Sequence, residues 1–401
     1  MKSPTRKQLD DLWTRHNAQW RDTAQIASQW QEAGDTDPRL LQHDIQGGWW
    51  QTIADCGLTL LVTREYEHLV MAMCVTDNGP QVSYMRLPHP SGLAIDRERG
   101  MIHIASTRNP NQVFDLMPAR SVLPRLDVKV DPPADQPLVP VGSRFYPGCL
   151  YLHDLAVVGG KLFGSAVGHN AIVQLGDDAG FRHAWWPRCI DSDSGPLFGQ
   201  NHIQLNSIAA TRELGDSFFT ASTDRPSARR PGFKNFPVDG RGVLFSGKTR
   251  EAYVRGLTRP HSARLYRGRV ALENSGYGEL GLASASGYEP VRRLPGWTRG
   301  LCFHKDVAFV GTSRVIPRFR QYAPGLDVDA SQCGVHAVDM TTGRMLGSLI
   351  WPYGNQVFAV DWVSIKLTRG LPFRVAAKPS ADRERALFYA FATRRTREVN
   401  Q

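Results

Sequence analysis

The chain has 401 residues, of which 41% are hydrophobic and 21% charged, and its formal net charge is +10 at pH 7. This composition is ordinary for a globular protein, and no segment reaches the roughly 20 apolar residues that a membrane-spanning helix needs. We therefore expect no membrane association. The basic residues are scattered along the chain, which favours a mild attraction to anionic ligands over specific nucleic-acid binding.

The N-terminal segment is charged throughout and lacks the apolar stretch of a secretory signal, which favours a cytoplasmic location. Residues 5–32 follow an amphipathic helical pattern with Leu9, Trp13 and Trp30 among polar residues. We expect residues 1–37 to form a short helical extension that packs on the rest of the chain or binds a protein partner. The six cysteines show no Cys-x-x-Cys spacing, so we expect them to be reduced.

Six times between residues 57 and 362, a short apolar strand is followed by a Gly-containing turn, a second strand and a polar turn. The opening strands are SGLAID (91–96), HDLAVV (153–158), NSIAAT (206–211), HSARLY (261–266), RGLCFH (299–304) and QVFAVD (356–361). This repetition is typical of a β-propeller, in which the first strand of each blade lies nearest the axis. We predict an all-β, six-bladed propeller over residues 38–365, with a peripheral C-terminal segment at 366–401.

The first hydrophobic repeat has three strands, at 58–65, 68–75 and 80–87, but no inner strand of its own. Residues 355–363 supply the missing strand, so strands from the two ends of the chain are expected to pair and close the ring. Blade two has strands at 101–107 and 112–116, followed by a Pro-rich segment at 131–142. Further strands are predicted at 159–168, 170–176, 181–187, 216–223, 242–247, 251–257, 269–275, 279–285, 288–296, 307–313, 334–340 and 344–352.

Alignment of the six opening strands places one polar side chain of each at an equivalent position. These side chains are Ser91, His153, Asn206, His261, Arg299 and Gln356. We expect them to form a ring around the central channel, where a ligand would bind. The loops inserted at 186–205, 224–241 and 314–333 are candidates for ligand specificity, because loops on a rigid scaffold usually carry recognition.

Three segments together resemble a known family: PHSARLYRGRVALENSGYGEL (260–280), LPGWTRGLCFHKDVAFVGTSR (294–314) and YGNQVFAVDW (353–362). They are similar to a bacterial family of conserved hypothetical proteins, a domain of unknown function, over about residues 40–365. The resemblance implies a six-bladed propeller and brings no established activity. A looser similarity links the chain to lactonases, strictosidine-synthase-like proteins and peptidyl-hydroxyglycine lyases, whose sites lie on the axis and often hold a metal.

The chain lacks the acidic inner residue and paired asparagines of a calcium lactonase site, and its histidines are closer to the lyase type. His153 and His261 occupy the ring, and His89 and His202 lie shortly before it. Four imidazoles at one channel mouth are suitable ligands for one divalent transition metal, zinc, iron or copper. The alternative is that these polar groups only hydrogen-bond one another and channel water.

Arg299 brings a permanent positive charge to the ring, and its planar guanidinium suits a carboxylate or phosphate. The alternative for Arg299 is a structural ion pair with Asp154 or Glu273. Asp154 is itself a candidate for ligand contact or for orienting a histidine. Glu273 and Tyr277 are candidates, with Arg299, for catalytic roles such as proton transfer.

Two functions follow from these residues. In the first, the axial site binds a small anionic molecule or peptide, and a metal-bound water drives hydrolysis or elimination. Ser91, Asn206, Gln356, Asp154 and Arg299 would then contact the ligand. In the second, the protein is a metal-free interaction scaffold that binds a protein partner through its inserted loops and N-terminal helix.

Overall fold

The structure is a computed structural model, and it describes residues 5, 7–11, 14–15, 36–108, 111–119, 133–227, 231, 233, 236–375, 382–383 and 386–387. Residues 7–11 and 14–15 are helical, and the rest of the expected N-terminal helix lies outside the described residues. Within the described part of the chain, no helix is both long and apolar enough to cross a bilayer.

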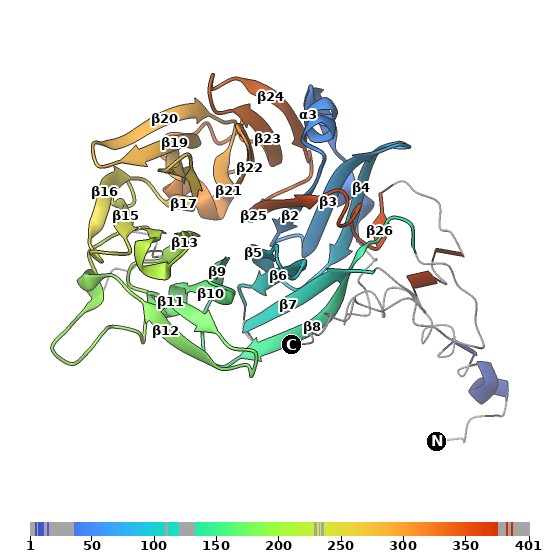
Figure 1. Cartoon of the computed structure of the whole chain (residues 1–401), viewed down its shortest axis with the longest axis horizontal. Helices are drawn as coiled ribbons and strands as arrows, with labels where there is room; N and C mark the ends of the chain where they lie inside the picture. The colour runs from blue at the N-terminus through green and yellow to red at the C-terminus, as the bar shows by residue number, and fades with distance from the viewer. Residues whose placement is uncertain are drawn as a thin grey trace, which may run out of the picture.

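Six antiparallel sheets surround a central axis, which confirms the predicted six-bladed propeller (Figure 1). Blade two contains β5 (Pro90–Asp96), β6 (Met101–Ser106), β7 (Asn111–Pro118) and β8 (Leu138–Tyr146). Blade three contains β9 (Leu152–Val158), β10 (Lys161–Ala166), β11 (Ala171–Leu175) and β12 (Phe181–Trp185). Blade four contains β13 (Leu205–Ala209), β14 (Phe218–Ala221), β15 (Gly242–Ser246) and β16 (Ala252–Leu257).

Blade five contains β17 (Pro260–Tyr266), β18 (Arg269–Asn274), β19 (Glu279–Ser284) and β20 (Gly287–Arg293). Blade six contains β21 (Trp297–His304), β22 (Val307–Ser313), β23 (Gly334–Asp339) and β24 (Met345–Ile350). Blade one contains β25 (Ala359–Ser364), β2 (Leu58–Arg64), β3 (Leu69–Thr76), β4 (Gly79–Arg86) and β26 (Phe373–Arg374). The first strand named for each blade contacts the first strand of the next blade around the ring, so these six strands surround the axis.

Blade one closes the ring with strands from both ends of the propeller, as predicted. β25 pairs antiparallel with β2, from Leu58 opposite Ser364 to Thr63 opposite Ala359. The Thr63 hydroxyl accepts a hydrogen bond from the Ala359 amide and donates one to the Ser91 carbonyl, which links this pair to blade two.

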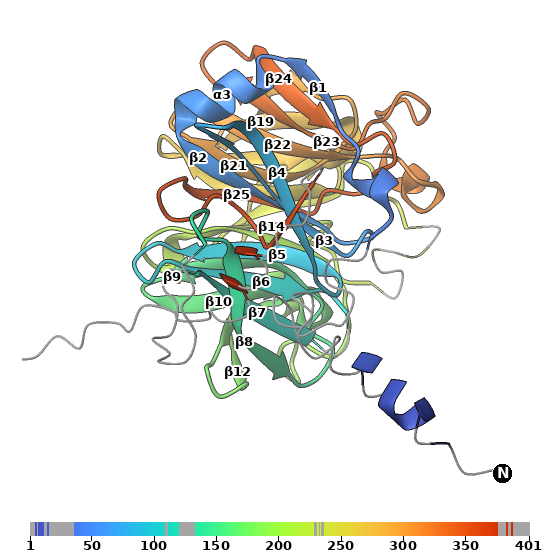
Figure 2. The same ribbon diagram turned by 90° about the vertical axis from the view of Figure 1, so that its right-hand side faces the viewer.

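Three elements extend the predicted blades. β1 (Asp44–Gly47) adds a fifth strand to the outer edge of blade six, and β26 does the same for blade one. The helix α3 (Trp49–Cys56) follows β1 and buries Trp49 and Ile53 in the apolar core between these two blades (Figure 2). β8 begins within the Pro-rich segment, where Pro140 is tolerated because the strand is at a sheet edge.

The other short helices are 3₁₀ turns in loops. Their bounds are Pro38–Leu41, Val167–His169, Arg188–Ile190, Leu214–Asp216, Ser275–Tyr277 and Pro317–Tyr322. All six cysteines are free thiols, in agreement with the sequence prediction.

Five of the six inner strands contain an irregular pairing at or next to the predicted ring position. In β21, for example, Thr298 pairs with Thr312 and Leu301 with Val310, so two inner residues face one partner residue. The other four lie in β5, β9, β13 and β17. A β-bulge bends a strand and redirects its side chains. The inner strands are otherwise mostly apolar, and the bulges thus account for the polar side chains at the ring positions.

The inner strands approach each other closely at this level, and glycine makes that approach possible in β5. A Cβ on Gly92 would lie 2.6 Å from the Asp154 Cα and 2.9 Å from the Leu155 amide nitrogen in β9. We expect Gly92→Ala to lower the free energy of unfolding by about 2 kcal/mol or more, because both strands would have to shift. Chemical denaturation measures this loss.

Gly199→Ala is the matched control for Gly92→Ala. A Cβ on Gly199 meets no atom within 4 Å. This variant should therefore stay within about 0.5 kcal/mol of the wild type. Equal stability of the two variants would show that the approach of β5 to β9 is not a constraint on the fold.

Candidate functional site

A cavity of about 320 Å³ opens at the end of the axis where the inner strands begin. Four of the six predicted ring residues line it: His153, His261, Arg299 and Gln356. The other two, Ser91 and Asn206, are not among its lining residues. The structure therefore brings together two thirds of the predicted ring in one cavity.

Four more lining residues stand two positions before a ring residue in their blades: Tyr151, Gln204, Arg259 and Trp297. Tyr151, Gln204 and Arg259 have φ values of 50°, 53° and 53°, a left-handed conformation that bulky side chains rarely adopt. Such strain is found mainly where the surrounding structure fixes a side chain for function. These residues form a second level of the cavity wall.

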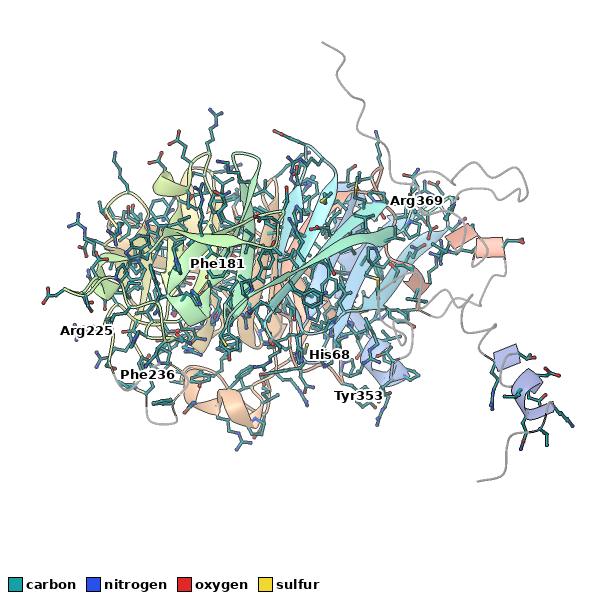
Figure 3. The ribbon with its side chains drawn as sticks, turned by 90° about the horizontal axis from the view of Figure 1, so that it is seen from below. His68, Phe181, Arg225, Phe236, Tyr353 and Arg369 are labelled. Carbon is teal, nitrogen blue, oxygen red and sulfur yellow. The ribbon has the colours of Figure 1, made fainter. Side chains whose placement is uncertain are left out.

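Loops inserted between strands cover part of the cavity. Pro231 comes from the loop at 224–241, whereas Phe319 and Tyr322 come from the loop at 314–333. Phe319 stacks on Trp297 with ring centroids 5.1 Å apart, and both belong to an apolar cluster that also contains Phe236. Figure 3 shows Phe236 on one face of the propeller and Arg369 toward the opposite face. The expected contribution of inserted loops to the site is thus visible in its geometry.

His153 and Arg299 meet at the base of the cavity. The Arg299 Nη2 donates to the His153 Nδ1 at 3.2 Å, and the guanidinium lies over the Phe358 ring, 3.2 Å from its centroid. Burial, together with the positive charges of Arg299 and Arg259, lowers the pKa of His153 well below its usual value. His153 is therefore a neutral imidazole at physiological pH.

His261 forms its hydrogen bonds within its own blade, blade five. Its Nδ1 lies 2.7 Å from the Arg259 carbonyl oxygen and 3.1 Å from the Ser275 hydroxyl. Burial and the charge of Arg299 lower the pKa of His261 well below its usual value. The ring of His261 packs edge-on against Trp297, with centroids 4.8 Å apart.

Among the described residues, the charged side chains that line the cavity are three arginines and one glutamate: Arg108, Arg259, Arg299 and Glu65. Burial lowers the pKa of Arg299 to about 10, so Arg299 remains a cation at neutral pH. Glu65 accepts a hydrogen bond from the Thr107 hydroxyl and lies 3.8 Å from the Arg108 side chain. With both histidines neutral, the wall carries an excess of positive charge.

Glu273 is fully buried on β18, where it pairs with His261 across the sheet. Burial raises the pKa of Glu273 to about 8, against smaller opposing effects of the Ser262 hydroxyl and the cations Arg264 and Arg299. Glu273 is not among the residues that line the cavity. Any effect of this carboxyl group on a ligand must therefore be electrostatic.

The histidines do not form a set of metal ligands. Within the described part of the chain, no group of three or more His, Cys, Asp or Glu residues is arranged to hold a metal ion. His89 and His202 do not line the cavity, and His89 instead contacts the His68 ring at 4.4 Å. His153 and His261 both lie near the positive charges of Arg299 and Arg259, which disfavour a bound cation. These residues do not fit a divalent cation, and we assign no step to one.

The remaining candidates have structural partners. Asp154 accepts two hydrogen bonds from Arg264, at 2.7 and 3.0 Å, and one from the Ile208 amide. The Ser91 hydroxyl donates to backbone carbonyls. The Asn206 Oδ1 accepts from Thr220, and the Tyr277 hydroxyl donates to Asp239 outside the cavity.

Sequence reasoning missed Tyr151, Gln204 and Arg259 as lining residues. The signal that could have found them was present, because each lies two positions before a ring residue, as His89 does in blade two. All three precede their strands and have positive φ values, so the signal is the shared spacing between blades and not the alternation of a strand. Glu65, Tyr66 and Arg108 gave no such signal, since they lie in loops after strands rather than in the aligned segments.

Several solved structures match the chain at low identity. The structure of a nidogen/laminin complex matches with a TM-score of 0.49 and 8% identity, over 76% of this chain and 98% of that chain. A gluconolactonase from Xanthomonas campestris matches with a TM-score of 0.42 and 12% identity, over 75% of this chain and 87% of its own. A putative gluconolactonase has a TM-score of 0.41 and 14% identity, over 67% and 80%.

At these identities and TM-scores, the matches carry no argument about residues or reactions. No curated protein matches the chain. The family described as Domain of unknown function (DUF4915) matches residues 47–369, which run from the end of β1 to beyond β25. This match agrees with the resemblance of the three segments around His261, Arg299 and Gln356, and the chain belongs to that family.

Proposed function

We propose that the protein binds a small anionic molecule in the axial cavity, with Arg299 as the principal contact for its negative group. The observation that carries this proposal is the excess of arginine over carboxylate in the cavity wall. A buried guanidinium without a carboxylate in bidentate contact retains hydrogen-bonding capacity for an anion. Arg299 donates to a neutral imidazole and makes no such pair among the described residues.

The comparison with Arg264 supports this distinction between a structural and a binding arginine. Arg264 is also an axial arginine, but Asp154 occupies its guanidinium in a bidentate ion pair. Burial lowers the pKa of Arg299, whereas Asp154 holds that of Arg264 above its usual value. An anion bound at Arg299 would supply the negative charge that Asp154 already supplies to Arg264.

A small molecule suits this site better than a protein surface does. Phe236, Phe319 and Tyr322 of the inserted loops are buried in one cluster with Trp297 rather than displayed to solvent. These loops therefore narrow the cavity, as expected for a pocket that encloses a ligand. The alternative function, a protein-interaction scaffold, requires these loops to form an open surface that binds a protein partner.

Replacement of Arg299 tests the proposal with acetate and inorganic phosphate as probes. We expect Arg299→Met to weaken binding of the preferred anion at least about tenfold, since a charge-assisted hydrogen bond is lost. Arg299→Lys should keep part of the affinity, because the charge remains. Isothermal titration calorimetry on the full chain measures both variants.

Arg267→Met is the matched control, because Arg267 lies in the turn after β17 and pairs with Asp306 at the surface. Its anion affinity should equal that of the wild type. If neither probe binds the wild type, or if Arg299→Met binds as tightly as Arg267→Met does, the proposed anion site is wrong.

Anion affinity should also depend on pH through Glu273. Its pKa is about 8, so Glu273 is mainly neutral at pH 7 and loses its proton as the pH rises through 8. The new negative charge acts on Arg299, which stays protonated because its pKa is about 10. We therefore expect acetate to bind more weakly at pH 9 than at pH 7, although acetate itself does not change charge in this range.

Glu273→Gln removes this titration while it keeps the side-chain shape. The variant should bind acetate with similar affinity at both pH values. A wild-type affinity that does not fall, or an equal fall in the variant, would show that Glu273 does not act on the site. Circular dichroism at each pH verifies that both proteins remain folded.

A further inference from the structure

The two cavity histidines have fixed and opposite tautomers. Arginine can only donate hydrogen bonds, so the His153 Nδ1 that receives the Arg299 N–H carries no proton. A carbonyl oxygen can only accept, so the His261 Nδ1 beside the Arg259 carbonyl carries the proton. Both rings are neutral, so one nitrogen of each ring carries the proton and the other carries a free lone pair. His153 therefore offers an N–H at Nε2, and His261 offers a lone pair at Nε2.

A second acceptor lies in the same cavity. Gln356 is 1% exposed, and its Oε1 has no hydrogen-bond partner among the described residues. The His261 Nε2 likewise makes no hydrogen bond there. Buried acceptors that lack a partner are costly, so each calls for an O–H or N–H from water or from a ligand. The cavity thus has unused acceptors as well as cationic donors.

Several aromatic side chains also line the cavity. Among the described residues, its aromatic side chains apart from histidine are Tyr66, Tyr151, Trp297, Phe319, Tyr322 and Phe358. Trp297 is 2% exposed, and its indole N–H has no partner among the described residues. Aromatic walls favour flat ligands, because stacked and edge-on ring contacts add to the burial of apolar surface. The volume of about 320 Å³ accommodates a single-ring compound.

We propose that the ligand of the axial cavity is a single-ring aromatic carboxylic acid that carries a hydroxyl group. The carboxylate contacts Arg299, the ring packs against the aromatic wall, and the hydroxyl donates to Gln356 or His261. This proposal rests on the proposed anion site and adds two requirements to it, a flat ring and a hydrogen-bond donor. Each requirement corresponds to a different set of residues and can be tested separately.

The test compares acetate, benzoate and the three monohydroxybenzoates by titration calorimetry with the full chain. We expect benzoate to bind at least about fivefold more tightly than acetate, because of ring packing. The best monohydroxybenzoate should gain at least about a further fivefold, which is typical of one added hydrogen bond. Phenol, which lacks the carboxylate, should bind more weakly than benzoate.

Substitutions of the lining residues show which side chains give each gain in affinity. Gln356→Met, and if necessary His261→Phe, should remove the advantage of the hydroxybenzoate over benzoate while benzoate still binds. Tyr322→Leu or Trp297→Leu should reduce the advantage of benzoate over acetate. The control is Gln46→Met, since Gln46 is exposed on β1 at the outer edge of blade six. Two variants for each requirement keep the test decisive if one of them fails to fold.

The outcomes separate this inference from the anion site itself. If benzoate binds no better than acetate, or no hydroxybenzoate exceeds benzoate, the aromatic hydroxy acid is wrong. Acetate binding that is lost in Arg299→Met would still support the anion site in that case. If neither acetate, benzoate nor any hydroxybenzoate binds, both proposals fail.

Discussion

The antiparallel pairing of β2 with β25 is the interaction on which both the fold and the cavity depend. It joins residues from the two ends of the propeller, so the ring closes without an exposed inner edge. Glu65 and Tyr66 follow β2, whereas Gln356 and Phe358 precede β25, and all four line the cavity. A chain in which this pair did not form would lose a blade and one side of the binding site together.

The two axial arginines differ in how their charge is compensated, and this difference distinguishes a structural arginine from a ligand-binding one. Deeper in the propeller, Arg264 is neutralised by Asp154, which also accepts the Ile208 amide and so ties three blades together. At the cavity, Arg299 faces a neutral histidine and an aromatic ring. Leaving a buried cation incompletely compensated costs stability. Such a cost is consistent with a site that is completed by an anionic ligand.

The sequence predicted the fold well, because a strand-and-turn unit repeated six times can bury its apolar faces only in a closed ring. It also predicted His153, His261, Arg299 and Gln356 as neighbours, since the inner strands are equivalent around the axis. It could not predict the bulges that redirect these residues, nor the hydrogen bonds that fix the histidines as neutral tautomers. Those depend on local backbone geometry within each blade and, for His153, on its contact with Arg299 of another blade. The sequence also could not show that only two of the four candidate histidines line the cavity, since His89 packs against His68 instead.

The direction of the β2–β25 pair has a mechanical consequence. Leu58, at the start of β2, pairs with Ser364, at the end of β25, so the ends that lead out of the propeller lie at the same end of the pair. Tension applied through the termini, once β1 and β26 have detached, would load these hydrogen bonds one after another rather than all at once. Blade one would unzip at low force, and the propeller would open at the seam beside its own binding site.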